Sequence, residues 1–187
     1  MSLDPHGSRT REMTTAALLA ALLAGTSWIT IRIGAVPFTL QTAFVLLAGM
    51  LLRPRWAAAS MGVYLTLGAV GLPVFSGGQA GLSALVGPTG GFLVGFALAA
   101  PVLAVVRRAI CRDGEGRGRS LEADIAGVLA AELAIYAVGV PWLMYSTGMG
   151  VSEAFVVAVL PFLVPDAAKA AVAVVVAGAV RRGRTVL

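Results

Sequence analysis

Short clusters of arginine divide the chain into a series of long apolar stretches. A bilayer core about 30 Å thick is crossed by an α-helix of roughly 20 apolar residues, and 58% of the chain is hydrophobic whereas 12% is charged. The pattern therefore predicts an all-α integral membrane protein with six transmembrane helices, the second of which is short. The expected spans cover about residues 14–31, 38–52, 56–72, 89–107 and 122–144, followed by a longer region over 152–181.

The basic residues are placed in alternate connections between these stretches. Of the 14 Lys and Arg residues, all but Arg32 and Lys169 precede the first stretch, follow the last, or lie between the second and third or the fourth and fifth. An excess of Lys and Arg marks the cytoplasmic loops of membrane proteins, so we expect both termini in the cytoplasm. The net charge of +5 follows this topology and forms no single basic face. We therefore expect membrane lipid, and no nucleic acid, as a partner.

One transmembrane domain is expected over residues 13–182, between a cytoplasmic N-terminal tail (1–12) and a C-terminal tail (183–187). A polar cytoplasmic loop at about 108–120 would separate the first four spans from the last two. An external loop at about 73–88 is rich in glycine and carries no charge. Irregular backbone at membrane depth is tolerated where it is buried or lines a cavity. This loop is therefore predicted to form a pocket wall or lid, and the alternative is a loop shaped only for packing.

Two ionisable residues, Asp166 and Lys169, interrupt the final apolar region. Such residues are costly within a membrane and mark functional sites that face the protein interior or a water-filled cavity. A spacing of three places both side chains on one face of a helix. Arg181, which is expected at the cytoplasmic surface, lies about 22 Å beyond Asp166 along an ideal helix. The pair is therefore expected near the outer edge of the membrane, in a pocket that opens to the outside.

Two prolines, Pro161 and Pro165, interrupt the same region. Proline breaks or kinks the interior of a helix but is favoured at the first helical position. We therefore expect a short helix over about 152–160 and a second helix that begins at Pro165 or Asp166. Asp166 would then lie in the first turn, where the helix dipole favours a carboxylate.

The sequence lacks the motifs of the common enzyme classes. The turn at Gly87-Pro-Thr-Gly-Gly has no lysine and is not a phosphate-binding loop, and no cluster of Cys and His has metal-ligand spacing. The single histidine, His6, lies in the N-terminal tail. We expect no enzyme activity, no metal, no cofactor and no ATP bound by this chain. Accumulation of a solute would then draw its energy from a partner or a gradient.

Five segments occur in a fixed order along the chain. They are Val36-Pro-Phe-Thr-Leu-Gln-Thr, Gly68-Ala-Val-Gly-Leu-Pro-Val-Phe-Ser-Gly-Gly, Gly87-Pro-Thr-Gly-Gly, Tyr136-Ala-Val-Gly-Val-Pro-Trp and Pro161-Phe-Leu-Val-Pro-Asp-Ala-Ala-Lys. With these segments the chain resembles the BioY family over about residues 14–180. That family comprises the biotin-specific substrate-binding S components of energy-coupling factor (ECF) transporters.

The resemblance implies an S-component fold in the cytoplasmic (inner) membrane of a prokaryote, and high-affinity capture and uptake of biotin. The implied partners are an ECF transmembrane coupling protein and two ATPase subunits. Two other functions stay open: an autonomous proton-coupled vitamin carrier that uses Glu132 or Asp166, and an S component for another vitamin. A membrane enzyme acting on a lipid or isoprenoid is disfavoured because no nucleophile or metal set is present.

The resemblance also implies where biotin binds. The family's Asp-x-x-Lys motif matches Asp166 and Lys169. A carboxylate can accept hydrogen bonds from the N–H groups of the ureido ring, and an ammonium can donate to its carbonyl or to the valerate carboxylate. A structural ion pair is the alternative. The other predicted ligand-binding residues are Gln41, Gln79, Gly78, Gly81, Thr89 and Tyr136, with Trp142 beside Tyr136 in an apolar wall.

Two of these predictions have an open alternative of their own. Gln41 lies at the start of the second span, where its side chain could instead form a helix-end hydrogen bond. Tyr136 and Trp142 lie in the fifth span, and aromatic residues near helix ends are also ordinary interfacial anchors.

Small residues recur at a spacing of four in the first span, at positions 16–20–24 and 17–21–25. Such stripes allow helices to approach closely in membranes. The resemblance implies that the first helix docks the coupling protein through them, and packing within the bundle is the alternative. The predicted docking residues are Ala16, Ala17, Ala20, Ala21 and Ala24.

Glu132 lies inside the fifth span, one helical turn before Tyr136. The resemblance does not identify it as a ligand-binding residue. Its role stays open between a proton-sensitive group, a partner for a cation on the coupling subunit, and a group hydrogen-bonded within the bundle.

Overall fold

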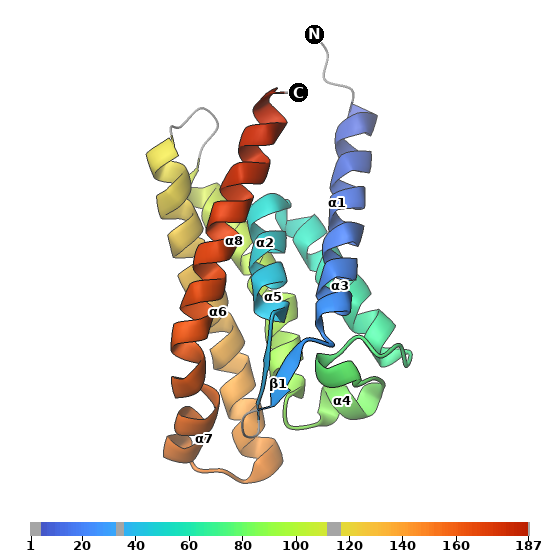
Figure 1. Ribbon diagram of the computed structural model, residues 1–187, viewed down its shortest axis with the longest axis vertical. Helices are drawn as coiled ribbons and strands as arrows, with labels where there is room; N and C mark the ends of the chain where they lie inside the picture. The colour runs from blue at the N-terminus through green and yellow to red at the C-terminus, as the bar shows by residue number, and fades with distance from the viewer. Residues whose placement is uncertain (1–4, 33–35, 112–116, 187) are drawn as a thin grey trace.

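The protein is a bundle of helices with a small β-hairpin, seen in a computed structural model that describes residues 5–32, 36–111 and 117–186 (Figure 1). The first turn of α1 and the last turn of α8 lie at the same end of the bundle, whereas β1, α4 and α7 lie towards the opposite end (Figure 1). The elements in chain order are α1 (Pro5–Thr26), β1 (Thr30–Arg32), β2 (Pro37–Thr39), α2 (Gln41–Leu51), α3 (Pro54–Ala69), η1 (Ser76–Gly78), α4 (Leu82–Val86), α5 (Gly90–Ile110), α6 (Arg117–Thr147), α7 (Val151–Ala158) and α8 (Leu160–Val186).

In the described part of the chain, 3 helical segments are long and apolar enough to cross a membrane. They are Gly90–Ile110, Ser120–Thr147 and Val151–Gly183, the last of which includes both α7 and α8. These segments coincide with the last three predicted spans and confirm that the protein is largely helical. Helix α2, at Gln41–Leu51, is apolar but shorter, as expected for the second span.

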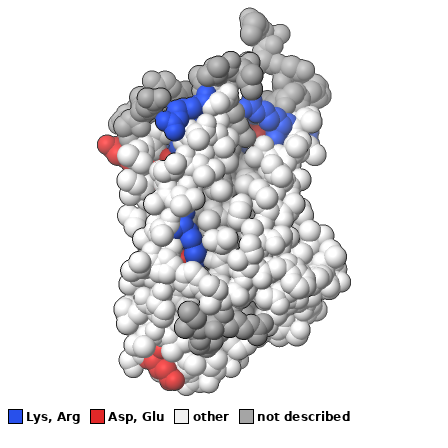
Figure 2. Space-filling model, in the orientation of Figure 1, with Lys and Arg blue, Asp and Glu red and all other residues white. Residues whose placement is uncertain are grey.

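The flank of the bundle is apolar. Leu98 of α5, Leu133 of α6 and Val175 of α8 are 46%, 70% and 67% exposed. On the face shown in Figure 2, most of the Lys and Arg gather at the end where α1 begins and α8 finishes (Figure 1), and one further basic patch lies midway along the flank. An apolar surface of this extent is unsuited to water and suited to lipid.

The predicted first span differs at its end. Helix α1 stops at Thr26, and the following residues form a two-stranded antiparallel sheet in which Thr30 pairs with Thr39 and Ile31 with Phe38. β-Branched and aromatic residues fit a pleated sheet well. The expectation of a purely α-helical fold is therefore wrong at this hairpin, and α2 begins only at Gln41 because the preceding residues belong to β2.

The final region contains two helices, as predicted, but their boundary differs. Helix α8 begins at Leu160, so it includes both prolines. Pro161 lies in the first turn, where a backbone N–H has no partner within the helix, and Pro165 removes only one further hydrogen bond. Asp166 therefore lies in the second turn of α8 and not in the first.

Helical turns also extend into two segments expected as tail or loop. Helix α1 begins at Pro5, and α5 continues to Ile110 while α6 begins at Arg117. Residues 1–4, 33–35, 112–116 and 187 lie outside the described residues. The predicted tail and the predicted 108–120 loop are thus partly helical in the described residues.

The segment expected as an external loop folds back onto the bundle. Phe75 is 1% exposed, and its ring meets the edge of Tyr64 of α3 with centroids 5.5 Å apart. A Cβ atom at Gly68 would lie only 2.0 Å from the Phe75 ring, so glycine in α3 provides the space that Phe75 fills. By contrast, Leu82 and Val86 of α4 are 67% and 69% exposed.

Helices α5 and α6 approach closely because glycine lies at their contact. A Cβ atom at Gly95 would lie 3.0 Å from Ile135 Cα, and one at Gly139 would lie 2.4 Å from the Phe92 ring. Small residues at such contacts are typical of membrane helices. The close approach fixes the relative position of the faces of α5 and α6 that carry polar and aromatic residues.

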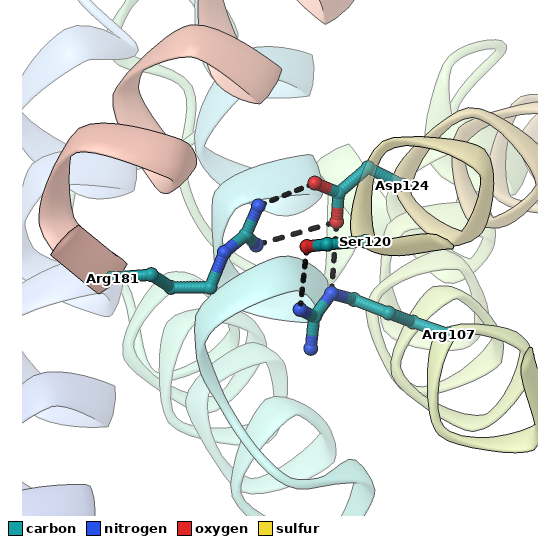
Figure 3. Close-up of polar contacts among 4 residues, drawn as sticks. All are labelled: Arg107, Ser120, Asp124 and Arg181. Atoms are coloured by element: carbon teal, nitrogen blue, oxygen red, sulfur yellow. Dashed lines mark hydrogen bonds and ion pairs between the residues drawn. The ribbon is translucent and has the colours of Figure 1, made fainter. Parts of the chain in front are cut away.

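An ion cluster joins three helices through Asp124 of α6, which is 1% exposed (Figure 3). Arg107 of α5 donates from Nε to Asp124 Oδ1 at 2.8 Å, and Arg181 of α8 donates to both carboxylate oxygens. Arg107 also donates to Ser120 Oγ at 3.4 Å. A buried carboxylate satisfied from both sides is tolerated, and this one connects α8 to α5 and α6.

Candidate functional site

A partly open cavity lies among β2, α2, α5, α6, α8 and the segment around η1. Counting the space that is open to the surface, it measures about 650 Å³. Its aromatic and aliphatic wall is formed by Val36, Pro37, Phe75, Phe92, Leu93, Phe96, Ile135, Ala158 and Phe162. Its polar lining is formed by Thr39, Gln41, Thr42, Ser76, Gln79, Thr89, Glu132, Tyr136, Asp166 and Lys169.

The predicted charged pair faces this cavity and is connected to a third group. Lys169 Nζ donates to Asp166 Oδ1 at 2.8 Å, and Tyr136 Oη donates to Asp166 Oδ2 at 2.7 Å. Asp166 and Lys169 are 9% and 8% exposed. Each carboxylate oxygen can accept a second hydrogen bond, and the ammonium has further N–H groups to donate. The three residues thus retain hydrogen-bonding capacity toward a ligand.

An aromatic platform lies beside this group. The Lys169 ammonium is 4.4 Å from the centroid of the Phe38 ring, a distance at which a cation is attracted to the ring face. Phe38 in turn stacks on Phe162 of α8, with centroids 5.4 Å apart and planes 22° apart. Strand β2 therefore contributes to the site by holding an aromatic ring beneath the ammonium.

Gln41 lines the cavity at the start of α2, and its amide already has partners. It is 2% exposed, its Nε2 donates to Tyr64 Oη at 2.6 Å, and its Oε1 accepts from Thr39 Oγ1 at 3.3 Å. The backbone N–H of Gln41 also bonds to Thr39 Oγ1 at 3.3 Å. The site position predicted for Gln41 and the helix-end hydrogen bond that was its alternative therefore occur together.

The loop residues divide into two groups. Gln79 and Thr89 line the cavity, whereas Gly78 and Gly81 do not. Both glycines have positive φ, 75° and 82°, a conformation that other residues rarely adopt. The Gly81 N–H donates to Gly68 O at 2.7 Å. These glycines shape the loop that carries Gln79.

Of the two aromatics predicted as a wall, Tyr136 lines the cavity and Trp142 does not. The Trp142 indole Nε1 donates instead to Gly87 O at 2.9 Å. That bond fixes the turn immediately before Thr89. Trp142 therefore acts on the site indirectly, by holding the turn that carries Thr89, and is not part of the cavity wall.

Several cavity residues were missed at the sequence level. Phe92 and Phe96 occupy positions four apart on α5 and face the cavity together, a spacing that could have been read as one helix face. Ser76 and Phe162 also line it; both lie in segments that carry the family resemblance, but neither has a charge or a spacing that would mark it as a site residue.

The predicted docking stripe on α1 faces two directions. Ala16 and Ala20 are buried at 5% and 2%, and Ser60 of α3 donates to Ala16 O at 2.9 Å. Ala17 and Ala21 are exposed, and Ala24 is half-buried. One half of the stripe thus packs inside the bundle, and the other half faces outward.

Among the described residues, no group of three or more His, Cys, Asp and Glu lies close enough to hold a metal ion. The cavity offers one ammonium, two carboxyl groups, amides, hydroxyls and aromatic faces. This set can bind a small solute that combines an apolar body with polar ends.

Comparison with known proteins identifies relatives along nearly the whole chain. The sequence model of the BioY family matches residues 2–185. A probable biotin transporter BioY of Pyrococcus horikoshii is 38% identical over 169 residues, which cover 90% of this chain and 95% of the relative. The biotin transporter BioY of Thermotoga maritima is 36% identical, covering 89% of this chain and 94% of the relative, and that of Rhizobium etli is 34% identical, covering 95% and 97%.

One solved structure shares the fold. It is the S-component for biotin from an ECF-type ABC transporter, which superposes with a TM-score of 0.83 at 23% sequence identity, over 97% of this chain and 95% of that one. The helical bundle with its hairpin is therefore an S-component fold.

Proposed function

The chain belongs to the BioY family, and on that premise we propose that it captures external biotin and takes it up across the membrane as the S component of an ECF-type transporter. It is a transport protein and not an enzyme. The relatives named as biotin transporters are matched over nearly their full length. Biotin is the ligand of this chain, and we propose that the chain itself binds no cofactor and no ATP.

The observation that carries this proposal is the buried group of Asp166, Lys169 and Tyr136 at an otherwise aromatic cavity. The ureido ring of biotin presents two N–H donors and one carbonyl acceptor. Asp166 would accept from one N–H, and Lys169 would donate to the carbonyl. The fused rings would lie against aromatic side chains that line the cavity, among them Phe92, Phe96 and Phe162.

The remaining predicted residues complete the site in two ways. Gln41, Gln79, Thr89 and Tyr136 line the cavity and would contact the ligand directly. Gly78 and Gly81 would act through the shape of the loop.

We propose six spans, formed by α1, α2, α3, α5, α6 and α8, with both termini in the cytoplasm of a prokaryote and the cavity open to the outside. The first turn of α1 and the last turn of α8 lie at one end, together with most of the Lys and Arg on the visible face (Figures 1 and 2). Such an excess of positive charge is typical of the cytoplasmic side. Strand β1 and α4 lie towards the other end (Figure 1), and β2, which pairs with β1, lines the cavity.

The proposed partners are the ECF transmembrane coupling protein and two ATPase subunits. The proposed docking surface is the small-residue stripe of α1. Ala17 and Ala21 face outward and would contact the coupling protein, while Ala16, Ala20 and Ala24 lie on the side that packs toward the bundle or at its border.

Calorimetry on the purified protein in detergent tests the binding site. We expect Asp166→Asn and Lys169→Ala to weaken biotin binding by about 10- to 100-fold, because the first removes the charge of a hydrogen-bond acceptor and the second removes a charged donor. Thiamine and riboflavin should produce no heat of binding with the unaltered chain. Biotin binding by both variants at the unaltered affinity would contradict the site assignment, and tighter binding of thiamine or riboflavin would assign the chain to another vitamin.

A further inference from the structure

Glu132 is a cavity residue that the proposed contacts leave unused. It lies on α6 and lines the cavity, and both of its carboxyl oxygens are buried without a hydrogen-bond partner among the described residues. Buried polar groups are nearly always hydrogen-bonded, and one left unpaired is costly. The cost is higher within a membrane, where ionisable residues are retained for function. A partner for Glu132 is therefore expected to arrive with the ligand.

The position of Glu132 places it beside the proposed ureido contacts. Glu132 and Tyr136 are four residues apart on α6 and thus share one helix face, and Tyr136 bonds to Asp166 of α8. Asp166 and Lys169 both interact electrostatically with Glu132. The residues of α5 that line the cavity are aromatic or aliphatic, and α2 contributes Gln41 and Thr42 to the lining.

These charged groups form a complementary set for a cyclic urea. Along its polar edge a cyclic urea presents an N–H, a carbonyl and a second N–H, which is a donor, an acceptor and a donor. A carboxyl, an ammonium and a second carboxyl present the opposite order of acceptor, donor and acceptor. Asp166 and Lys169 supply the first two members. Gln41 Oε1 already accepts from Thr39 and keeps one acceptor position, whereas both Glu132 carboxyl oxygens have no partner among the described residues, so Glu132 is the stronger candidate for the third member.

We propose that Glu132 is a further specificity-determining residue of this chain, and that it accepts a hydrogen bond from the second ureido N–H of the ligand. The proposal rests on the biotin site proposed above. With both N–H groups and the carbonyl paired, the cavity would recognise the whole ureido edge. A site built to pair a donor strongly disfavours an analogue that lacks it, because its own acceptor is then left buried and unsatisfied.

The test combines substitutions with ligand analogues. Binding of biotin is compared with binding of two lactam analogues, in each of which one ring N–H is replaced by CH₂, using the unaltered chain, Glu132→Gln and Glu132→Met. We expect Glu132→Met to weaken biotin binding by about 10- to 100-fold, and Glu132→Gln to weaken it less because its amide keeps an acceptor oxygen. Glu132→Met should weaken binding of one lactam very little, namely the one that lacks the N–H paired with Glu132. It should weaken binding of the other lactam about as much as it weakens binding of biotin.

The lactam pair separates ligand contact from a structural role. A substitution that only loosened the bundle would weaken biotin and both lactams by the same factor, and that result would overturn the proposal. Unchanged biotin binding by Glu132→Met would overturn it as well. Leu133→Met is the matched control, because its side chain is on the same helix, is 70% exposed and does not line the cavity.

The unaltered chain provides a second measurement should Glu132→Met fail to fold. Both lactams must then bind more weakly than biotin, and equal binding of either one would mean that its missing N–H has no acceptor. Failure of this inference is distinguishable from failure of the proposed function. If the unaltered chain does not bind biotin, the function is wrong, whereas if Asp166→Asn loses affinity and Glu132→Met does not, only the role of Glu132 is wrong.

Discussion

A single hydroxyl group links two helices at the cavity. Tyr136 Oη donates to Asp166 Oδ2 across α6 and α8. In Tyr136→Phe the ring keeps its packing, but Asp166 loses a donor that orients its carboxylate. We expect biotin affinity to fall by about 3- to 10-fold, equivalent to one modest hydrogen bond, as measured by calorimetry. Tyr145→Phe, at an 89% exposed position of the same helix, should bind like the unaltered chain, and equal affinity of both variants would argue against the orienting role.

Residues differ in how far the sequence could assign them. Asp166 and Lys169 were recognisable because an ionisable group in an apolar span is costly in any fold. The direction of a side chain in a loop or at a helix end depends on contacts from elsewhere in the chain. Trp142 bonds to Gly87, and a Cβ at Gly78 would meet the Trp28 ring. Neither Trp142 nor Gly78 lines the cavity, although Gly78 is next to Gln79, which does.

At the scale of elements, Asp124 connects three helices through the two arginines shown in Figure 3. Asp124→Ala would leave Arg107 and Arg181 close together without their shared carboxylate. Removing one member of a buried ionic group is strongly destabilising. Because the arginines are partly exposed, we expect a loss of about 2–3 kcal/mol, seen as a lower unfolding temperature in detergent. Glu122→Ala on the exposed side of α6 is the control, and equal unfolding temperatures would show that the cluster contributes little.

The elements themselves were predictable to different degrees. The apolar length of α5 and α6 fixes their type, because a bilayer accepts only helices or closed barrels. The β1–β2 hairpin was missed because Thr30, Ile31 and Phe38 suit a helix in lipid as well as a strand. The start of α8 was placed too late because two prolines suggested a break, whereas the break lies at Val159, between α7 and α8.

At the scale of the whole molecule, the proposed uptake requires contact with a coupling protein through α1. We expect Ala17→Leu and Ala21→Leu to leave calorimetric biotin binding unchanged, because both side chains face away from the bundle. Uptake into vesicles that contain the coupling subunits should fall several-fold, because small residues permit close helix contact. Ala58→Leu on an exposed face of α3 is the matched control.

The same vesicles report on the energy source. Uptake should require ATP and the coupling subunits, and uptake driven by a proton gradient alone would identify an autonomous carrier instead. Unimpaired uptake by both α1 variants would show that the small-residue stripe of α1 does not dock the coupling protein and serves only packing within the bundle.

The hydrogen bond between the Trp142 indole and the Gly87 carbonyl has a practical consequence. The chain contains 3 tryptophans, and substituting Trp28 and Trp56 with phenylalanine leaves Trp142 as the single tryptophan, hydrogen-bonded to the turn that precedes Thr89. Light emitted by that indole depends on whether its N–H stays bonded. In that variant, the fluorescence of Trp142 would report changes in the turn beside the cavity without an added dye.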